Sequence, residues 1–249
     1  MSSVIAQIYD PLGLLAPLIV RAKILLQRVW ALKIDWDESL PAEVHTEWNR
    51  YYILLPLLND IRFSRKTIIK AANHIDLHGF CDTSEKAYGA CIYLRSINSD
   101  EHIQTQLLTA RSKVAPLKCL TIPRLELMGA LLFTSPMSVV RKSLTINGSR
   151  IVYWTDSTIV LQWIKSSLHT LKTFVANHVA EIQTKTNIAD WRHVSTDDNP
   201  ADLISRGQTP KEFLRPTIWK NGPEWPKRPE ENWPMWTQHR WEKSRNKER

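Results

Sequence analysis

Apolar and polar residues alternate over residues 75–82, and a second apolar and aromatic run follows at 87–94. The first run ends at Asp82, and four residues separate the two runs. Alternation of this kind is typical of a half-buried strand, and a short polar connection between two such runs is typical of a hairpin. The pattern therefore predicts two antiparallel strands, with Asp82 at the end that faces the turn.

The next periodic segment has the spacing of a helix. Pro123 suits the first turn of a helix, where its missing N–H costs nothing. We therefore expect Glu126 in that first turn. Pro136 lies further along the same segment and predicts a kink or a break. The apolar side of this helix comprises Leu125, Leu127, Met128, Leu131 and Leu132.

Residues 151–155 are apolar and aromatic and predict a buried strand, which the helical pattern of residues 157–165 follows. This places Asp156 at a strand-to-helix corner. Residues 188–194 predict a further strand, followed by a loop rich in Asp and Asn and a short helix that contains Asp202.

The first part of the chain predicts helices. Residues 11–20 are apolar but contain two prolines and a glycine, and they are too short to span a bilayer. We expect one helix at 17–32, with Ile24, Leu25, Val29 and Trp30 as buried candidates. A second helix at about 41–60 should be kinked or split at Pro56.

Four acidic residues occupy comparable positions near element ends. Such residues are mostly solvated surface, and an acid in a first helical turn is ordinary dipole chemistry, so position alone does not make a site of Asp82, Glu126, Asp156 and Asp202. Their order and setting are more specific. The contexts HGFCDTSEKAYGACIYL, TIPRLELMGALL, IVYWTDSTIVLQW and DDNPADLISRG together resemble the ribonuclease H domain of reverse transcriptases.

The wider sequence narrows this resemblance. The stretches DPLGLLAPLIVRAKILLQRVWALKIDWDE and RGQTPKEFLRPTIWKNGPEW resemble the BEL/Pao class of long-terminal-repeat retrotransposons, from about Tyr9 to about Trp225. The resemblance implies an α/β fold: a ribonuclease H-like five-stranded mixed sheet with helices on both faces, preceded by a small helical region. An integrase-type nuclease is disfavoured, because its site ends in a late Glu.

The resemblance implies a metal-dependent endoribonuclease that cuts the RNA strand of an RNA–DNA hybrid. Two Mg²⁺ ions about 3.5–4 Å apart, with Mn²⁺ as the alternative, can stabilise the attacking and leaving oxygens. By position, Asp82 bridges both ions, Glu126 and Asp156 hold one, and Asp202 helps to hold the other. Carboxylates packed so closely repel, so we expect raised pKa values and weaker metal binding in acid.

The resemblance also predicts three parts. Residues 1–73 resemble the thumb or connection region of a reverse transcriptase, residues 74–207 the ribonuclease H-like domain, and residues 208–249 a basic linker or tail rich in Trp and Pro. No paired aspartates occur in 1–73, so no polymerase site is expected in this chain. We expect a fragment of a polyprotein, with other segments of that polyprotein as partners.

The distribution of positive charge indicates candidate residues for nucleic-acid binding. The formal charge is +8, and Arg111, Lys113, Lys118 and Arg124 gather between the predicted third strand and the helix of Pro123. We expect these four to contact a nucleic-acid backbone, although a solvated basic loop is the plain alternative. The Trp-rich segment 208–249 fits an extended segment laid on a surface better than a base-stacking platform.

Two further readings follow from single residue types. Many ribonuclease H domains carry a mobile His before the last Asp, but His193 falls within the predicted strand, so we expect a structural role. Three cysteines without a pairing motif argue against disulfides and zinc, and favour an intracellular, reducing compartment, cytoplasmic or nuclear.

The sequence leaves three functions open: an active ribonuclease H, a nucleic-acid-binding protein that does not cut, and an inactive interaction remnant of a retrotransposon polyprotein. It also leaves the oligomeric state open. No membrane association is expected.

Overall fold

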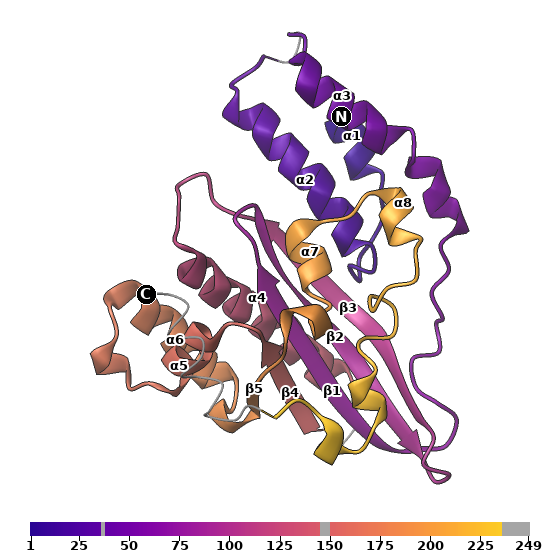
Figure 1. The fold of residues 1–249 in the computed structure, drawn as a ribbon, viewed down its shortest axis with the longest axis vertical. Helices are drawn as coiled ribbons and strands as arrows, with labels where there is room; N and C mark the ends of the chain where they lie inside the picture. Colours follow the sequence, from indigo (N-terminus) through magenta and orange to yellow (C-terminus); the bar gives the residue numbers. More distant parts are fainter. Residues whose placement is uncertain (36–37, 145–149, 236–249) are drawn as a thin grey trace.

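A five-stranded mixed sheet forms the centre of the computed structural model, which describes residues 1–35, 38–144 and 150–235 (Figure 1). The strand order is β3-β2-β1-β4-β5. Strands β1, β2 and β3 pair antiparallel, whereas β4 and β5 are added in parallel. The predicted ribonuclease H-like sheet is thereby confirmed. The strands are β1 (Ala72–Thr83), β2 (Ala87–Asn98), β3 (Ile103–Val114), β4 (Arg150–Thr155) and β5 (Trp191–His193).

The long helix α4 (Ile122–Ser143) covers one face of this sheet together with α5 (Thr158–Lys165) and α6 (Thr173–Lys185). Phe133 of α4 packs so closely on β1 that a Cβ on Gly79 would lie 1.6 Å from the tip of its ring. Only glycine allows this approach, because any side chain would displace the helix.

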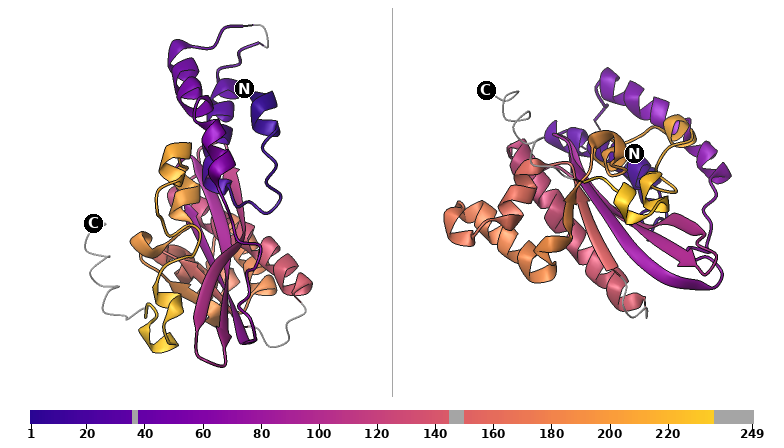
Figure 2. Two further views of the ribbon diagram at one scale, coloured as in Figure 1. Left: turned by 90° about the vertical axis from the view of Figure 1, so that its right-hand side faces the viewer. Right: turned by 60° about the horizontal axis from the view of Figure 1, so that its bottom comes forward.

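The opposite face is covered by segments that are far apart in the sequence. The short helices α7 (Asp202–Arg206) and α8 (Pro210–Phe213) lie there, followed by the 3₁₀ turns Trp225–Lys227 and Glu230–Asn232 (Figure 2, left). Trp219, Trp225 and Trp233 are all buried in this layer. The Trp-rich segment therefore packs as part of the core as far as Trp233, and residues 236–249 lie outside the described part of the chain.

Hydrogen bonds to the backbone carbonyls of this segment hold it on the sheet. The hydroxyl of Tyr93 donates to the carbonyl of Trp219 at 2.6 Å, and the N–H of Leu107 donates to the carbonyl of Lys220 at 2.9 Å. Arg95 is buried, donates to the carbonyl of Pro226 at 2.5 Å and forms an ion pair with buried Asp76 at 2.7 Å. A buried arginine needs such partners, because an unpaired charge in the interior is very costly.

The N-terminal helices lie at the end of the sheet where β1 passes into β2 (Figure 1). They are α1 (Ser2–Ala6), α2 (Ala16–Ala31) and α3 (Ala42–Tyr52), and the 3₁₀ turn Leu55–Asp60 follows α3. Leu25 of α2 packs against Trp48 and Tyr51 of α3. The predicted split before Pro56 is confirmed, because α3 ends at Tyr52.

Three local predictions need correction. Trp30 is 67% exposed, because the buried side of α2 comprises Leu18, Val20, Ala22 and Leu25 instead. Helix α4 continues through Pro136 without a break. Strand β5 spans only Trp191–His193, because residues 188–190 form a 3₁₀ turn.

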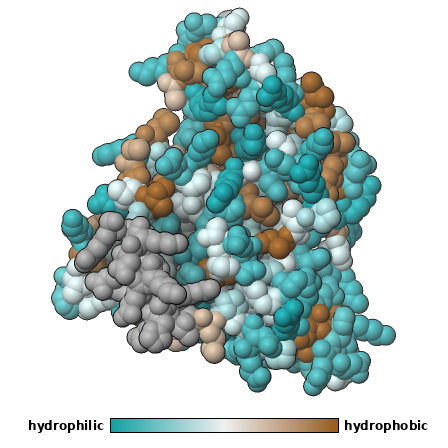
Figure 3. Space-filling view, viewed as in Figure 1, coloured by the Kyte–Doolittle hydropathy of each residue, from teal (hydrophilic) through white to brown (hydrophobic). Residues whose placement is uncertain are grey.

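The visible surface is mainly polar, with small, separate apolar patches (Figure 3). Within the described ranges, no helix combines the length and the apolar character that a membrane crossing requires.

His78 lies fully buried in the Trp-rich layer. The indole N–H of Trp154 donates to its Nδ1 at 3.2 Å, so the imidazole is neutral with its proton on Nε2. The pKa of His78 is lowered to about 3, chiefly by burial and secondly by the charges of Arg95, Arg150 and Arg192, against the opposing charge of Glu230. The folded protein therefore excludes a proton that the unfolded chain accepts below its usual pKa of about 6.5.

We predict that this histidine makes the fold sensitive to acid. Its contribution is fully present above pH 6.5 and is lost as the pH falls toward 3, by about 2 kcal/mol between pH 6.5 and pH 5. Urea unfolding at pH 7 and pH 5 should show this extra loss for the parent and for a His169→Phe control, whose histidine is exposed. His78→Phe should lack it. An equal loss in His78→Phe would contradict the assignment.

Candidate functional site

Two of the predicted carboxylates meet through the register of parallel strands. Asp82 is the penultimate residue of β1, and Asp156 directly follows β4. Cys81 of β1 is the partner of Thr155 of β4, so Asp82 and Asp156 occupy neighbouring positions at the same end of the sheet. Adjacent strands are about 4.8 Å apart, so these two charges interact directly.

Glu126 reaches the same end of the sheet from α4. It is the fifth residue of that helix, so the prediction that it lies in the first turn is wrong. The hydroxyl of Ser157 donates to Glu126 Oε2 at 2.6 Å and accepts from the N–H of Val160 at 3.2 Å. Ser157 thus caps α5 and links Glu126 to the corner that carries Asp156.

Asp202 is the first residue of α7, as predicted for a short helix after the Asp- and Asn-rich loop. The side chain of Asn199, which is buried, ties this loop to the end of β1 by donating to the carbonyl of Cys81 at 3.0 Å. Sequence analysis did not single out Asn199, although an Asn–Pro pair before a helix is a usable turn signal.

Each carboxylate has a partner within the chain. Thr196 donates to Asp156 Oδ2 at 2.9 Å, and Arg206 pairs with Asp202 Oδ1 at 2.6 Å. The hydroxyl of Ser205 donates to Asp82 Oδ2. Together with the Ser157–Glu126 bond, these contacts hold the four acids in defined orientations.

Burial and mutual repulsion raise the pKa of two of these acids. The pKa of Asp82 rises to about 7, chiefly because the group is buried and secondly because Asp156 is near, while the Ser205 hydrogen bond opposes the rise. Burial also raises the pKa of Asp202, against the opposing effect of Arg206. The predicted raised pKa values are confirmed for both residues, but burial rather than repulsion is the main cause.

The donor set fits a hard divalent cation in kind, since all four side chains offer carboxylate oxygens. Within the part of the chain that the structure describes, however, no group of three or more His, Cys, Asp or Glu is arranged to hold a metal ion. Each of the four acids instead has a hydrogen-bonding or ion-pair partner among the described residues.

His193 lies in β5, opposite Thr155 of β4, as expected for a strand residue. It lines a pocket of about 670 Å³ together with Lys165, Trp191 and Arg192 of the same region. Its predicted structural role stays a prediction.

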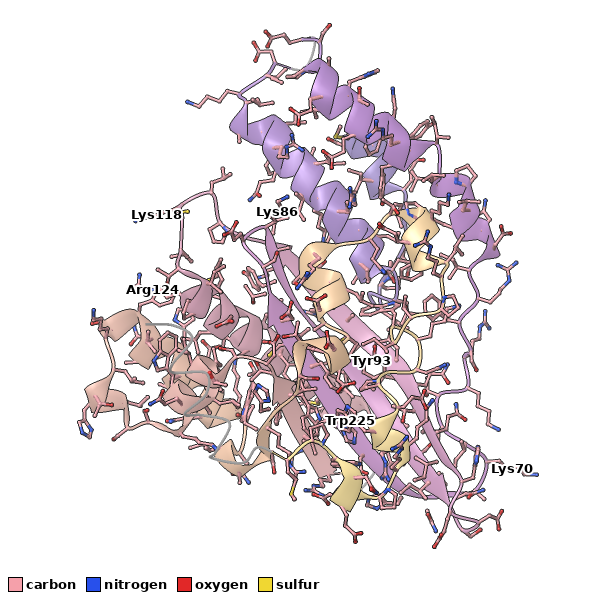
Figure 4. All side chains as sticks on the ribbon, in the orientation of Figure 1. Lys70, Lys86, Tyr93, Lys118, Arg124 and Trp225 are labelled. Carbon is pink, nitrogen blue, oxygen red and sulfur yellow. The ribbon has the colours of Figure 1, made fainter. Side chains whose placement is uncertain are left out.

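The predicted basic residues separate into two groups. Arg111 and Lys113 are exposed on the edge strand β3 and line one pocket. Lys118 lies in the exposed loop before α4, and Arg124 lies on α4 with its guanidinium 5.2 Å from the ring centre of Phe174 (Figure 4). Their contact with nucleic acid stays a prediction.

Ser205 is a further site residue that sequence analysis did not single out. Its side chain is fully buried, its hydroxyl also lies 3.1 Å from the carbonyl of Asp202, and its own carbonyl accepts from Ser84 at 2.6 Å. Helix α7 can come this close because Gly89 has no side chain. A Cβ at that position would lie only 2.3 Å from Ile204 of α7. A serine in a short helix carries no signal that would reveal these contacts.

We predict that Ser205→Ala raises the pKa of Asp82 further above about 7, because a hydrogen bond to the charged form is lost. Carboxyl ¹³C NMR during a pH titration measures this directly. Ser166→Ala is the control, because its hydroxyl bonds only to the carbonyl of Gln162 at 2.8 Å on α5. An unchanged Asp82 titration in Ser205→Ala would show that this hydrogen bond does not stabilise the carboxylate.

Comparison with solved structures finds several ribonucleases H. The chain is similar to RNase H1 from the halophilic archaeon Halobacterium salinarum NRC-1, with 12% identity and a TM-score of 0.33 over 53% of this chain and 94% of that chain. The N-terminal RNase H domain of Rv2228c from Mycobacterium tuberculosis is 11% identical with a TM-score of 0.32, over 57% of this chain and 96% of that chain. LC11-RNase H1, solved in complex with an RNA/DNA hybrid, is 13% identical with a TM-score of 0.30, over 56% of this chain and 99% of that chain.

These scores are low, so the fold assignment rests on the strand order and strand directions of this chain. No curated protein matches the sequence. A family model described as a Pao retrotransposon-like RNaseH-like domain matches residues 1–157, which include Asp82, Glu126 and Asp156. Because that match covers more than half of the 249 residues, the chain belongs to the family of Pao retrotransposon-like RNaseH-like domains.

Proposed function

We propose that this chain is a ribonuclease H-type endoribonuclease that hydrolyses the RNA strand of RNA–DNA hybrids. The observation that carries the proposal is the convergence of Asp82, Glu126, Asp156 and Asp202, in that chain order, at one end of a ribonuclease H-like sheet. Membership of the Pao family supports it, since the family is defined by an RNaseH-like domain.

Each acid has a proposed role. Asp82 lies between Asp156 and α7 and is the candidate bridge between two metal sites, with Glu126 and Asp156 at one and Asp202 at the other. Mg²⁺, or Mn²⁺ in its place, would activate a water molecule and stabilise the leaving 3′ oxygen. Asp82 is buried and lies near the charge of Asp156, which together raise its pKa, and a bound cation would offset both effects.

The surrounding residues orient these groups. Ser157 and Thr196 fix Glu126 and Asp156 through hydrogen bonds of 2.6 and 2.9 Å. Lys118 and Arg124 stand at the start of α4, close to Glu126 in sequence, and would contact the phosphates of a hybrid. A hybrid is distinguished from duplex DNA by its wide minor groove and its 2′-hydroxyls.

A second function is favoured by one observation. The contacts of Ser205 with Asp82 and of Arg206 with Asp202 occupy oxygens that a metal site would use. If these contacts persist when cation is present, the chain is a nucleic-acid-binding or interaction module that does not cut. The three-part division at residues 73 and 207, and partnership with other polyprotein segments, stay predictions.

The decisive experiment is cleavage of an RNA–DNA hybrid, labelled on the RNA strand, by the purified chain with Mg²⁺. We expect cleavage by the parent and a loss of more than about 100-fold in Asp82→Asn and in Asp156→Asn, since both are proposed metal ligands and even outer contacts cost 10–100-fold. Full activity in either variant would contradict the assigned site.

Folding and binding separate inactivity from misfolding. Asp82→Asn removes a buried charge with a raised pKa, so the variant should be at least as stable as the parent near pH 8. Both variants should bind the hybrid as the parent does in the absence of divalent cations. A parent that folds and binds but does not cut would favour the second function.

A further inference from the structure

A pocket of about 380 Å³ lies where α2, the edge strand β3 and α4 meet. Three cationic side chains line it: Lys23 from α2, and Arg111 and Lys113 from β3. Arg111 and Lys113 are two residues apart on one strand, so both lie on the same face of β3. The pocket therefore collects positive charge from two segments that are nearly 90 residues apart in the sequence.

The positive charge of this pocket is not neutralised. None of the ion pairs among the described residues involves Lys23, Arg111 or Lys113. The one acid in the lining, Asp10, accepts the N–H groups of Leu14 and Leu15 at 2.8 Å each, and its charge offsets only part of the positive charge. The formal charges of the lining thus sum to +2, from three cations and one acid, and this excess favours an anion.

The edge of the sheet adds a backbone donor. The N–H of Ala110 points away from β2, since it donates to the carbonyl of Leu12 at 2.8 Å. Ser112, two residues on, also lines the pocket and directs its N–H the same way, because donors alternate along an edge strand. A backbone N–H between cationic side chains is a common element of phosphate sites.

The state of Lys23 agrees with an anion site. Partial burial lowers its pKa, and the charge of Asp10 only partly offsets this. A cation held in such surroundings gains most when an anion replaces the lost water.

The pocket lies close to the carboxylate site, on the other flank of α4. Ser112 pairs with Gly89, and Gly89 pairs with Asp82, so the pocket is two strands, about 10 Å, from Asp82. Ser135, which lines the pocket, follows Glu126 by nine residues and so lies on the opposite side of α4. A single nucleic acid that lies across this end of the molecule can therefore contact both the pocket and the carboxylate site.

We propose that this pocket binds a backbone phosphate of the nucleic acid, with Lys23, Arg111 and Lys113 as the ligands. The proposal rests on the proposed function for its choice of a nucleic acid over free phosphate. It gives the N-terminal helices a part in substrate binding, because Lys23 belongs to α2.

The test uses the full chain carrying Asp82→Asn, so that binding is measured without cutting. Fluorescence anisotropy of a labelled RNA–DNA hybrid is followed at several salt concentrations. Adding Lys23→Gln and Arg111→Gln should weaken binding about 5- to 20-fold and reduce the slope of log K against log salt by about 2. The matched control is Arg65→Gln with Lys70→Gln, an exposed arginine and lysine that precede the start of β1 at the other end of the sheet (Figure 4).

We expect the control to change affinity less than 2-fold. If the variant with Lys23→Gln and Arg111→Gln binds the hybrid with the same affinity and the same salt slope as the parent, the proposed phosphate site is wrong. Titration of the parent with inorganic phosphate forms a second arm: phosphate binding that this variant loses, with hybrid binding intact, would overturn the nucleic-acid assignment and leave a free-phosphate site. Thermal unfolding verifies that the variants are folded. If the variant with both changes is not folded, the binding measurement is made with Lys23→Gln alone.

The two proposals fail separately. A parent that never cuts, but whose hybrid binding depends on Lys23 and Arg111, contradicts the nuclease and supports the subsite. A parent that cuts, but whose binding ignores both residues, supports the nuclease and contradicts the subsite.

Discussion

The structure depends on aromatic packing over the face of the sheet that α4 does not cover. Trp154 of β4 is fully buried there, with its ring centre 4.5 Å from that of Trp225 and 6.2 Å from that of Phe80. Aromatic side chains bury 150–250 Å² each, so this layer is a large share of the apolar surface removed from water. Because Trp225 comes from the end of the described chain, the sheet is covered on both sides only when the C-terminal segment is in place.

This layer also sets the properties of the carboxylate site. His78, Phe80 and Asp82 alternate along β1 and lie on one face, so the buried aromatic surface leads directly to the acid. Asp82 is consequently removed from water, which is the main reason for its raised pKa. The charge is tolerated because Ser205 and the N–H of Thr83 hydrogen-bond to it. The fold thus keeps, at the end of its central strand, an acid that is costly for stability, as functional sites commonly do.

Sequence pattern was sufficient where periodicity is strong. The alternation before Asp82 fixed the hairpin, and the apolar run ending at Thr155 fixed the corner of Asp156, so the register of two parallel strands brought both acids together. It failed where tertiary contacts decide. Trp30 was expected to be buried because of its residue type, but the side of α2 that packs is the one with Leu18, Val20, Ala22 and Leu25. The Ser205–Asp82 contact joins residues 123 positions apart, and no local pattern contains it.

The relation of the N-terminal helices to the sheet bears on the expected boundary at residue 73. The family match runs through that boundary, from residue 1 to 157. Contacts cross it as well: Gln27 donates to the carbonyl of Ala115 at 2.6 Å, and the N–H of Gln208 donates to the carbonyl of Pro17 at 2.8 Å. Both contacts lie beside the carboxylate end of the sheet. Helix α2 is therefore held next to that end of the sheet, and under the proposals above a nucleic acid bound at the four acids could also contact the cationic side chains that α2 and β3 present.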